Sequence, residues 1–84
     1  MRLSEFADKR IINIFDGDIL GIAGDSDLLI EPDSGRILEI IVPAGRGFGG
    51  AARRQQLVIP WSAVKKVGSE VIVVELEDAV KYYR

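Results

Sequence analysis

Apolar and polar residues alternate along most of this chain, and no helical repeat of apolar residues continues beyond about two turns. This period-2 pattern predicts a β protein. The first strand is expected over residues 10–15 and the second over residues 18–30. The apolar residues of the second strand that share one face are Leu20, Ile22, Leu28 and Ile30. Gly21 and Gly24 interrupt this run, and we therefore expect a bend or a bulge there.

Two turns can be recognised from their residue types. Asp16 and Gly17 separate the first two strands, and an Asp-Gly pair favours a tight hairpin of type I′, in which both central residues have a positive φ. Residues 31–35 have the sequence EPDSG, in which proline presets φ, the polar side chains bond to nearby backbone groups, and Gly35 accepts the left-handed conformation. The sequence therefore predicts two hairpins in its first half.

The middle of the chain contains two further predicted strands. Residues 36–43 are apolar on both faces, so this strand is expected to be central in the sheet or covered on both sides. Residues 44–54 form a glycine-rich loop, and the fourth strand follows over residues 56–59.

Pro60 ends the fourth strand and suits the first position of a helical turn that carries Trp61 and ends at Gly68. If the strands close into a barrel, a tryptophan here can fill its mouth or serve as an exposed anchor for a partner, and we favour the first interpretation. A fifth, valine-rich strand is expected over residues 71–76, buried on both faces.

These elements predict an all-β fold. We expect a small, strongly bent antiparallel barrel of five to six strands, with one short helical turn after the fourth strand. The chain has 84 residues, which is enough for one core, and residues 1–76 are expected to form that domain. Residues 77–84 are expected to be a tail, for which both a two-turn helix and a frayed end are compatible with the pattern.

The charge distribution is uneven although the net charge is only −2. Residues 1–39 carry nine acidic and four basic side chains, whereas residues 40–69 carry no acidic side chain. The basic residues of the second segment are Arg46, Arg53, Arg54, Lys65 and Lys66. Such asymmetry is typical of a partner-facing surface, and it is equally typical of charges that meet across the folded surface.

The glycine-rich loop offers three interpretations. Gly45, Gly47 and Gly50 have the spacing GxGxxG, but no long helix follows them, so we interpret the match as a flexible loop without a dinucleotide. The second and third interpretations are a docking site for a protein and a site for nucleic acid, and we favour the protein because the chain as a whole is acidic. The residues that would contact a partner are Arg46, Phe48, Arg53 and Arg54 in the loop, together with Lys65 and Lys66 beyond it.

Catalysis is restricted by what the composition lacks. The chain contains no His, Cys or Thr, which excludes Ser-His-Asp and Cys-His nucleophile systems and zinc sites of the usual nitrogen and sulfur type. The spacing of Asp16, Asp18, Asp25 and Asp27 does not match an EF-hand loop. We therefore expect no enzyme, no cofactor and no metal site.

No apolar run approaches the ~18 residues of a membrane span, and the first residues lack the apolar segment of a secretory signal, so a cytoplasmic location is expected.

Three stretches of the chain resemble the PRC-barrel domain, and more narrowly the YlmC/YmxH sporulation branch of that family. They are MRLSEF at the start, GDILGIAGDSDLLIEPDSGRILEIIVP, and LVIPWSAVKKVGSEVIVVEL. Together they cover nearly all of the chain up to Leu76, and IPW followed by KKVG is the most specific part. The loop departs from the branch, where it is often rich in aromatic residues, because here it holds only Phe48.

The resemblance implies a protein-binding module without catalytic residues, like the PRC-barrel domain of the ribosome maturation factor that docks on a ribosomal protein. It also implies a link to spore-forming bacteria. We therefore expect a sporulation adaptor that acts through the basic glycine-rich loop and the strand edges, with an unidentified protein partner. The alternative is an RNA-associated accessory protein that uses the same loop. Because an open strand edge has to be paired or covered, a homodimer is also expected.

Overall fold

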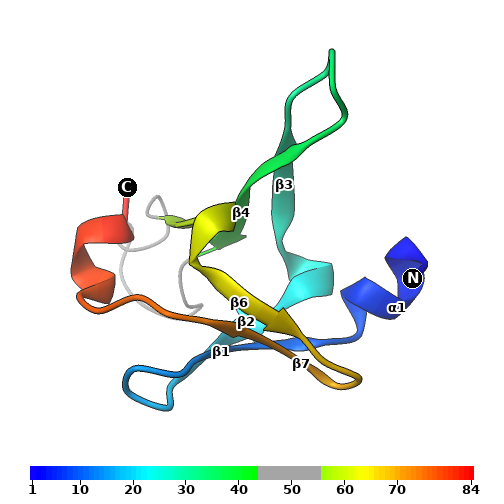
Figure 1. Ribbon diagram of the computed structural model, residues 1–84. Coiled ribbons are helices and arrows are strands. Elements are labelled where there is room, and N and C mark those ends of the chain that lie inside the picture. The colour runs from blue at the N-terminus through cyan, green and yellow to red at the C-terminus, as the bar shows by residue number, and fades with distance from the viewer. Residues whose placement is uncertain (44–55) are drawn as a thin grey trace.

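The computed structural model describes residues 1–43 and 56–84. Within these ranges the chain forms seven short strands, one α-helix and three 3-10 turns (Figure 1). In chain order they are α1 (Leu3–Ala7), β1 (Arg10–Asn13), β2 (Ile19–Ile22), η1 (Ala23–Asp25), β3 (Asp27–Ile30), β4 (Ile37–Pro43), β5 (Gln56–Pro60), η2 (Trp61–Ala63), β6 (Val64–Val67), β7 (Val71–Val74) and η3 (Ala79–Tyr82).

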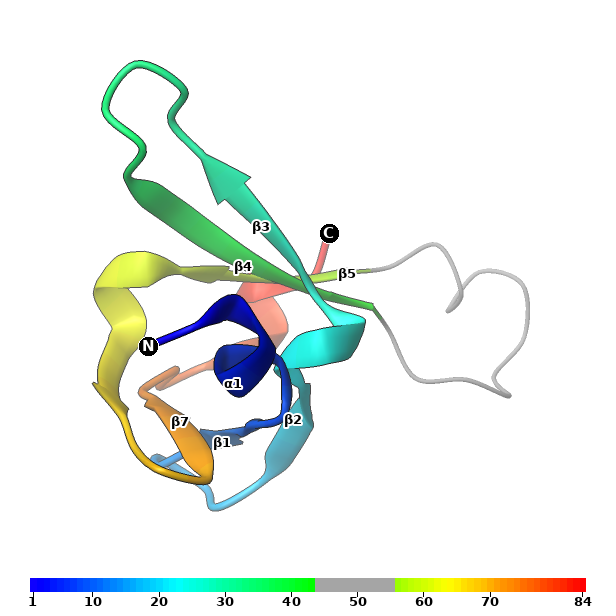
Figure 2. The ribbon, with the colours of Figure 1, turned by 90° about the vertical axis from the view of Figure 1, so that its right-hand side faces the viewer.

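The strands form two sheets. One has the order β2-β1-β7-β6 and the other the order β3-β4-β5. All neighbouring strands are antiparallel except β1 and β7, which pair in parallel. The chain passes from one sheet to the other at η1 and at η2 (Figures 1 and 2). The predicted β class is confirmed, but the described part holds seven strands where five or six were expected, and one pair is parallel.

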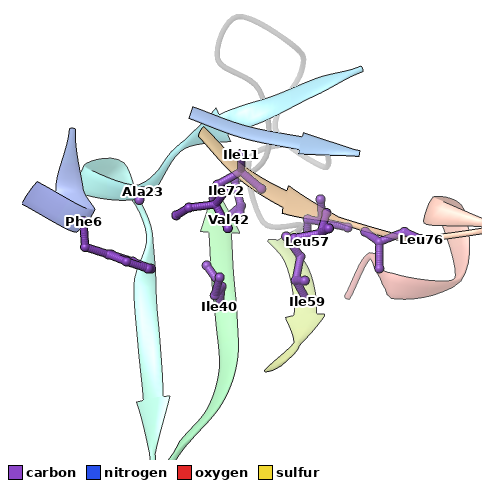
Figure 3. Packing of buried hydrophobic residues seen from close by; sticks show 10 residues of the cluster. Phe6, Ile11, Ala23, Ile40, Val42, Leu57, Ile59, Ile72 and Leu76 are labelled. Carbon is purple, nitrogen blue, oxygen red and sulfur yellow. The ribbon is translucent and has the colours of Figure 1, made fainter. Parts of the chain in front are cut away.

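The core lies between the two sheets (Figure 3). Ile11 and Ile72 enter it from the four-stranded sheet, and Val42 and Leu57 enter it from the other sheet. The strand over residues 36–43 was expected to be central, and β4 is indeed the middle strand of its sheet. The last strand differs from the expectation, since it alternates between fully buried and half-buried side chains and is not buried on both faces.

Both predicted hairpins are present. The turn of the first hairpin does not have the predicted type I′ geometry. In each, a four-residue loop is closed by a glycine whose amide donates to the carbonyl before the loop: Gly17 to Asn13 at 2.7 Å, and Gly35 to Glu31 at 2.8 Å. Gly17 has a φ of 79°, whereas no described residue other than glycine has a positive φ. Asp16 therefore does not adopt a type I′ conformation; its Oδ1 instead accepts a hydrogen bond from the amide of Asp18.

The expected second strand is two strands that belong to different sheets. The chain bends at η1, close to Gly24, and a bulge in β2 lies opposite Ile11 and Ile12. Gly21 lies at this bulge, where a Cβ would be 2.9 Å from the Cγ1 of Val42 in the other sheet. The predicted bend and bulge are thus confirmed. The single shared face predicted for the whole run is wrong, because the bend changes the direction in which the side chains point.

The helical turn after Pro60 is shorter than expected. Pro60 is the last residue of β5 and has extended geometry, so it precedes the turn and does not begin it. The turn ends at Ala63, and the residues expected to continue it form the strand β6. Gly68 consequently belongs to a hairpin between β6 and β7, where its amide donates to the carbonyl of Val71 at 2.7 Å. Trp61 and Val64 have the i, i+3 spacing of a helix, but the pairing of residues 64–67 with β7 determines the conformation of this segment.

The tail folds back onto the edge of β5. After the short turn η3, Gln56 and Arg84 exchange two backbone hydrogen bonds of 2.7 and 2.8 Å. Tyr82 packs against the core, whereas Val80 is exposed, so the predicted two-turn helix is reduced to one turn with a different buried face. The predicted domain boundary at residue 76 stays a prediction. None of the helices in the described ranges has the length and apolar character needed to cross a bilayer.

Candidate interaction surfaces

The hairpin formed by β3, the turn of residues 31–36 and β4 extends away from the rest of the molecule, and we call it the arm (Figures 1 and 2). Three of its large apolar side chains are exposed: Leu29 by 45%, Ile30 by 49% and Leu38 by 43%. An isolated two-stranded hairpin exposes both of its faces to water and is at best marginally stable. The arm therefore presents apolar surface that this chain alone does not bury.

The tip of the arm is fixed by local hydrogen bonds. The Oε1 of Glu31 accepts a hydrogen bond from the amide of Ser34 at 2.8 Å, and the Oγ of Ser34 accepts one from the amide of Arg36 at 3.2 Å. The backbone amides of Ser34 and then Asp33 lower the pKa of the Glu31 carboxyl. Because these bonds favour the charged carboxylate, the turn is most stable when Glu31 is ionised.

A shallow groove of about 510 Å³ runs between the arm and the turn η2. Its apolar wall is made by Ile37, Leu38, Pro60 and Trp61, and Glu31, Ser34, Arg36 and Ser62 form its polar rim. We call it the arm groove. An apolar wall with a few polar groups at the rim is typical of a site that holds an apolar side chain of a partner.

Trp61 contributes both to the core and to the surface, whereas its role as an anchor for a partner stays a prediction. Its ring is half-buried and packs against the core cluster, while its remaining surface lines the arm groove. It follows directly from the extended Pro60, which ends β5 and directs the chain into η2. The tryptophan therefore connects the core to a surface on which a partner can dock.

A second apolar surface lies on the outer face of the four-stranded sheet, opposite the core. Strand pairing places Ile19, Ile12 and Val73 in one row across three strands, and Ile22 and Val71 flank Arg10 in the neighbouring row. The members that share this face are Ile12, Ile14, Ile19, Ile22, Val71 and Val73, and we call them the outer apolar patch. Ile14 is 62% exposed and Ile19 is 60% exposed.

Charged residues border the outer apolar patch. Lys66 pairs with Val73 at the edge strand β6, and Arg10 lies beside Val71. Glu75 follows β7 and forms an ion pair of 3.6 Å with Lys65, in which both side chains are about half exposed. Lys65 and Lys66, two of the six predicted contact residues, are thus strand residues at this border. The other four, Arg46, Phe48, Arg53 and Arg54, lie outside the described residues, as do the three glycines of the GxGxxG match.

Two of the four clustered aspartates bond to the local backbone. Asp16 accepts a hydrogen bond from the amide of Asp18, and Asp27 accepts one through its Oδ1 from the amide of Leu28, both at 2.9 Å. In residues 1–43 and 56–84, no group of three or more acidic side chains lies close enough together to hold a metal ion.

Sequence reasoning did not predict either apolar surface. The alternating pattern placed Ile22 and Ile30 on one face with Leu20 and Leu28, and Ile22 and Ile30 are 45% and 49% exposed. One signal was present: residues 11–15 are apolar at both odd and even positions except Asn13, so both faces of this segment are apolar, and only one of them packs in this core. The other face had to remain on the surface or meet a partner.

The comparison with known proteins agrees with this fold. The PRC-barrel domain family matches residues 1–80. Two relatives come from Bacillus subtilis: "Probable sporulation protein YlmC", 36% identical over 90% of this chain and 93% of its own length, and "Uncharacterized protein YmxH", 32% identical over 93% and 92%. A protein of Clostridium acetobutylicum, "Uncharacterized protein CA_C1697", is 30% identical over 77% of this chain and 72% of its own length. No solved structure matches the chain. With two sheets, little helix and a family match over nearly its whole length, the chain belongs to the PRC-barrel domain family.

Proposed function

We propose that this chain is a non-catalytic protein-interaction module of sporulation, and that a partner protein docks in the arm groove. The observation that carries the proposal is the arm itself, which holds Leu38 and Ile37 beside Trp61 on a hairpin that extends beyond the body. The link to sporulation is supported by the similarity to the relative named as a probable sporulation protein.

The chemistry of the groove indicates what kind of partner it fits. Trp61 and Pro60 give a rigid apolar wall, and Arg36 supplies a cation at the rim. An extended segment that inserts one large apolar side chain against Trp61 would bury both Trp61 and Leu38. A tryptophan in such a position contributes much of the binding free energy of an interface, because it offers a large area at low cost in conformational entropy.

The absence of His, Cys and Thr from the sequence supports a non-catalytic role, since it removes the commonest nucleophile and base systems. The alternative role, RNA binding through the loop over residues 44–54, depends on side chains outside the described residues. We therefore treat RNA as an outcome of the experiment that follows.

The test compares two variants of the arm in sporulating cells. Leu38→Glu introduces a charge into the arm groove, whereas Leu29→Glu introduces the same charge on the same hairpin, at nearly the same exposure but outside the groove lining. A tagged chain is captured with and without ribonuclease, and the retained proteins are identified by mass spectrometry. We expect a protein that is retained by the wild type and by Leu29→Glu, and lost from Leu38→Glu.

Two results would contradict the proposal. If Leu38→Glu retains the same proteins as the wild type, the arm groove is not the docking site. If ribonuclease alone removes every retained protein, the association depends on RNA. Circular dichroism of both variants shows whether the fold is intact, which is expected because both side chains are already exposed.

A further inference from the structure

The outer apolar patch is an exposed apolar surface that the proposed docking in the arm groove does not use. It lies on the other sheet, where Ile12 belongs to β1, Ile19 and Ile22 belong to β2, and Ile14 directly follows β1. Ile14, Ile19 and Ile22 are 62%, 60% and 45% exposed. Together they expose on the order of a few hundred Å², and an apolar patch of this size on a soluble protein is often functional.

Arg10 and Glu75, which border the two ends of the patch, differ in sign; Asp8 and Glu70 lie close to Arg10, and Lys65 pairs with Glu75. Arg10 lies at one end, beside Val71, and Glu75 lies on the same strand face as Val71 at the other end, four residues later. If two copies pack face to face with their β1 strands parallel, Arg10 faces Arg10 of the other copy. If the strands are antiparallel, the Arg10 end of each copy lies over the Glu75 end of the other, and both charge contacts are favourable.

We propose that a second copy of this chain covers the outer apolar patch in a two-fold symmetric dimer, with the two β1 strands antiparallel across the interface. The two-fold axis passes near Ile12, the central residue of the patch, and runs across the strands. A patch with an apolar centre and opposite charges at its ends is complementary to itself under this rotation, which is the requirement for a symmetric interface. The ion pair between Glu75 and Lys65 does not prevent this contact, because exposed pairs of this kind contribute little.

The size of the patch sets the expected strength of the dimer. Two patches with their polar rims would bury roughly 1,000 Å² in total, which is at the lower end for a specific interface. We therefore expect a weak dimer with a Kd on the order of 10 µM, in exchange with the monomer.

Sedimentation velocity of the full chain tests the proposal between about 1 and 500 µM, a range that brackets the expected Kd. The expected result is a mass that rises from 9.2 kDa towards twice that value. Ile19→Lys places a charge in the centre of the patch and is expected to weaken association by at least about 50-fold. Leu29→Lys is the matched control, because it places the same charge on the arm, and it is expected to leave the Kd unchanged within about two-fold.

A charge exchange tests the orientation. Arg10→Glu alone and Glu75→Arg alone each place like charges opposite one another and are expected to weaken association by about five-fold or more at low salt. The double variant restores opposite charges and is expected to recover the wild-type Kd within about two-fold.

Three results would overturn the proposal. They are a wild type that stays monomeric up to about 500 µM, an Ile19→Lys variant that associates as well as the wild type, and a double variant that is weaker than both single variants. Because none of these measurements depends on the arm groove, they decide the dimer separately from the proposed docking function. A dimer lost in Leu29→Lys but not in Ile19→Lys would place the contact on the arm and would also count against the proposal.

Discussion

The side-chain amide of Asn13 pairs with both backbone groups of Leu76. Its Nδ2 donates to the carbonyl of Leu76 at 3.0 Å, and its Oδ1 accepts from the amide of Leu76, also at 3.0 Å. The same Oδ1 accepts a hydrogen bond from the amide of Phe15 at 3.2 Å. Asn13 has no exposed surface, so this one side chain extends the ladder between β1 and β7 where the strands themselves end.

We predict that Asn13→Ala lowers the free energy of unfolding by about 2–4 kcal/mol. The substitution leaves the buried amide and carbonyl of Leu76 without partners, and each unsatisfied buried group costs about 1–3 kcal/mol. Urea unfolding followed by circular dichroism measures the change. Asp18→Ala, an exposed substitution in the same hairpin, is the control and should stay within about 0.5 kcal/mol of the wild type. A loss no larger than that of the control would show that Leu76 finds other partners.

Gly21→Ala is predicted to destabilise the fold by about 1–3 kcal/mol, because its Cβ would lie 2.9 Å from the Cγ1 of Val42. Val42 is buried and β-branched, so it cannot rotate freely to make room. The double variant Gly21→Ala, Val42→Ala should lose less free energy of unfolding than the sum of the losses in the two single variants, by about 1 kcal/mol. Additive losses in this double-mutant cycle would mean that backbone freedom, and not the contact between the sheets, requires glycine.

The turn at the tip of the arm is predicted to loosen in acid. The pKa of Glu31 is lowered in the folded chain, so the stabilisation that its carboxylate provides is present above the pKa of the unfolded chain and is lost as the pH falls through the lower folded pKa. NMR titration of the Ser34 amide should give a midpoint below that of Glu31 in the urea-unfolded chain. Equal midpoints in the two states would contradict the hydrogen bond. In Glu31→Gln the Ser34 amide should show no comparable transition.

Trp61→Ala is predicted to lower the free energy of unfolding by roughly 2 kcal/mol, less than the ~3–5 kcal/mol typical of a fully buried aromatic residue, because Trp61 is only partly buried and lines the arm groove. Leu76→Ala provides the comparison, since Leu76 is fully buried and should cost about 2–5 kcal/mol. Guanidinium unfolding monitored by circular dichroism gives both values. A Trp61→Ala variant that does not fold would show that Trp61 serves mainly to stabilise the core.

The sequence predicted what depends on local chemistry. The turns at Gly17 and Gly35 require a positive φ, which residues other than glycine rarely adopt. The bend close to Gly24 follows from a glycine inside a strand-like run. It did not predict the strand β6, because Val64, Lys65 and Lys66 suit a helical turn as well as a strand, and only pairing with β7 decides between them. Nor could it predict the role of Asn13, whose partner is 63 residues away.

The candidate site shows the same division. Pro60 and Trp61 were recognised from their types, but their position beside the arm depends on the pairing of β4 with β5, which joins segments on either side of residues 44–55. The exposure of Ile14 and Ile19 depends on which face of the sheet meets the core, and alternation cannot decide this when both faces are apolar. Non-local pairing therefore determined most of what local patterns left open.

The parallel pairing of β1 with β7 also sets the order in which the protein can fold. β2 can pair with β1 as soon as both have been synthesised, but the ladder with β7, and with it the burial of Asn13, has to wait until the last strand has left the ribosome. Contacts separated by so many residues are slow to form. During synthesis the β1–β2 hairpin would be exposed on both faces, so nascent chains should be vulnerable to aggregation and to proteolysis until the last strand arrives.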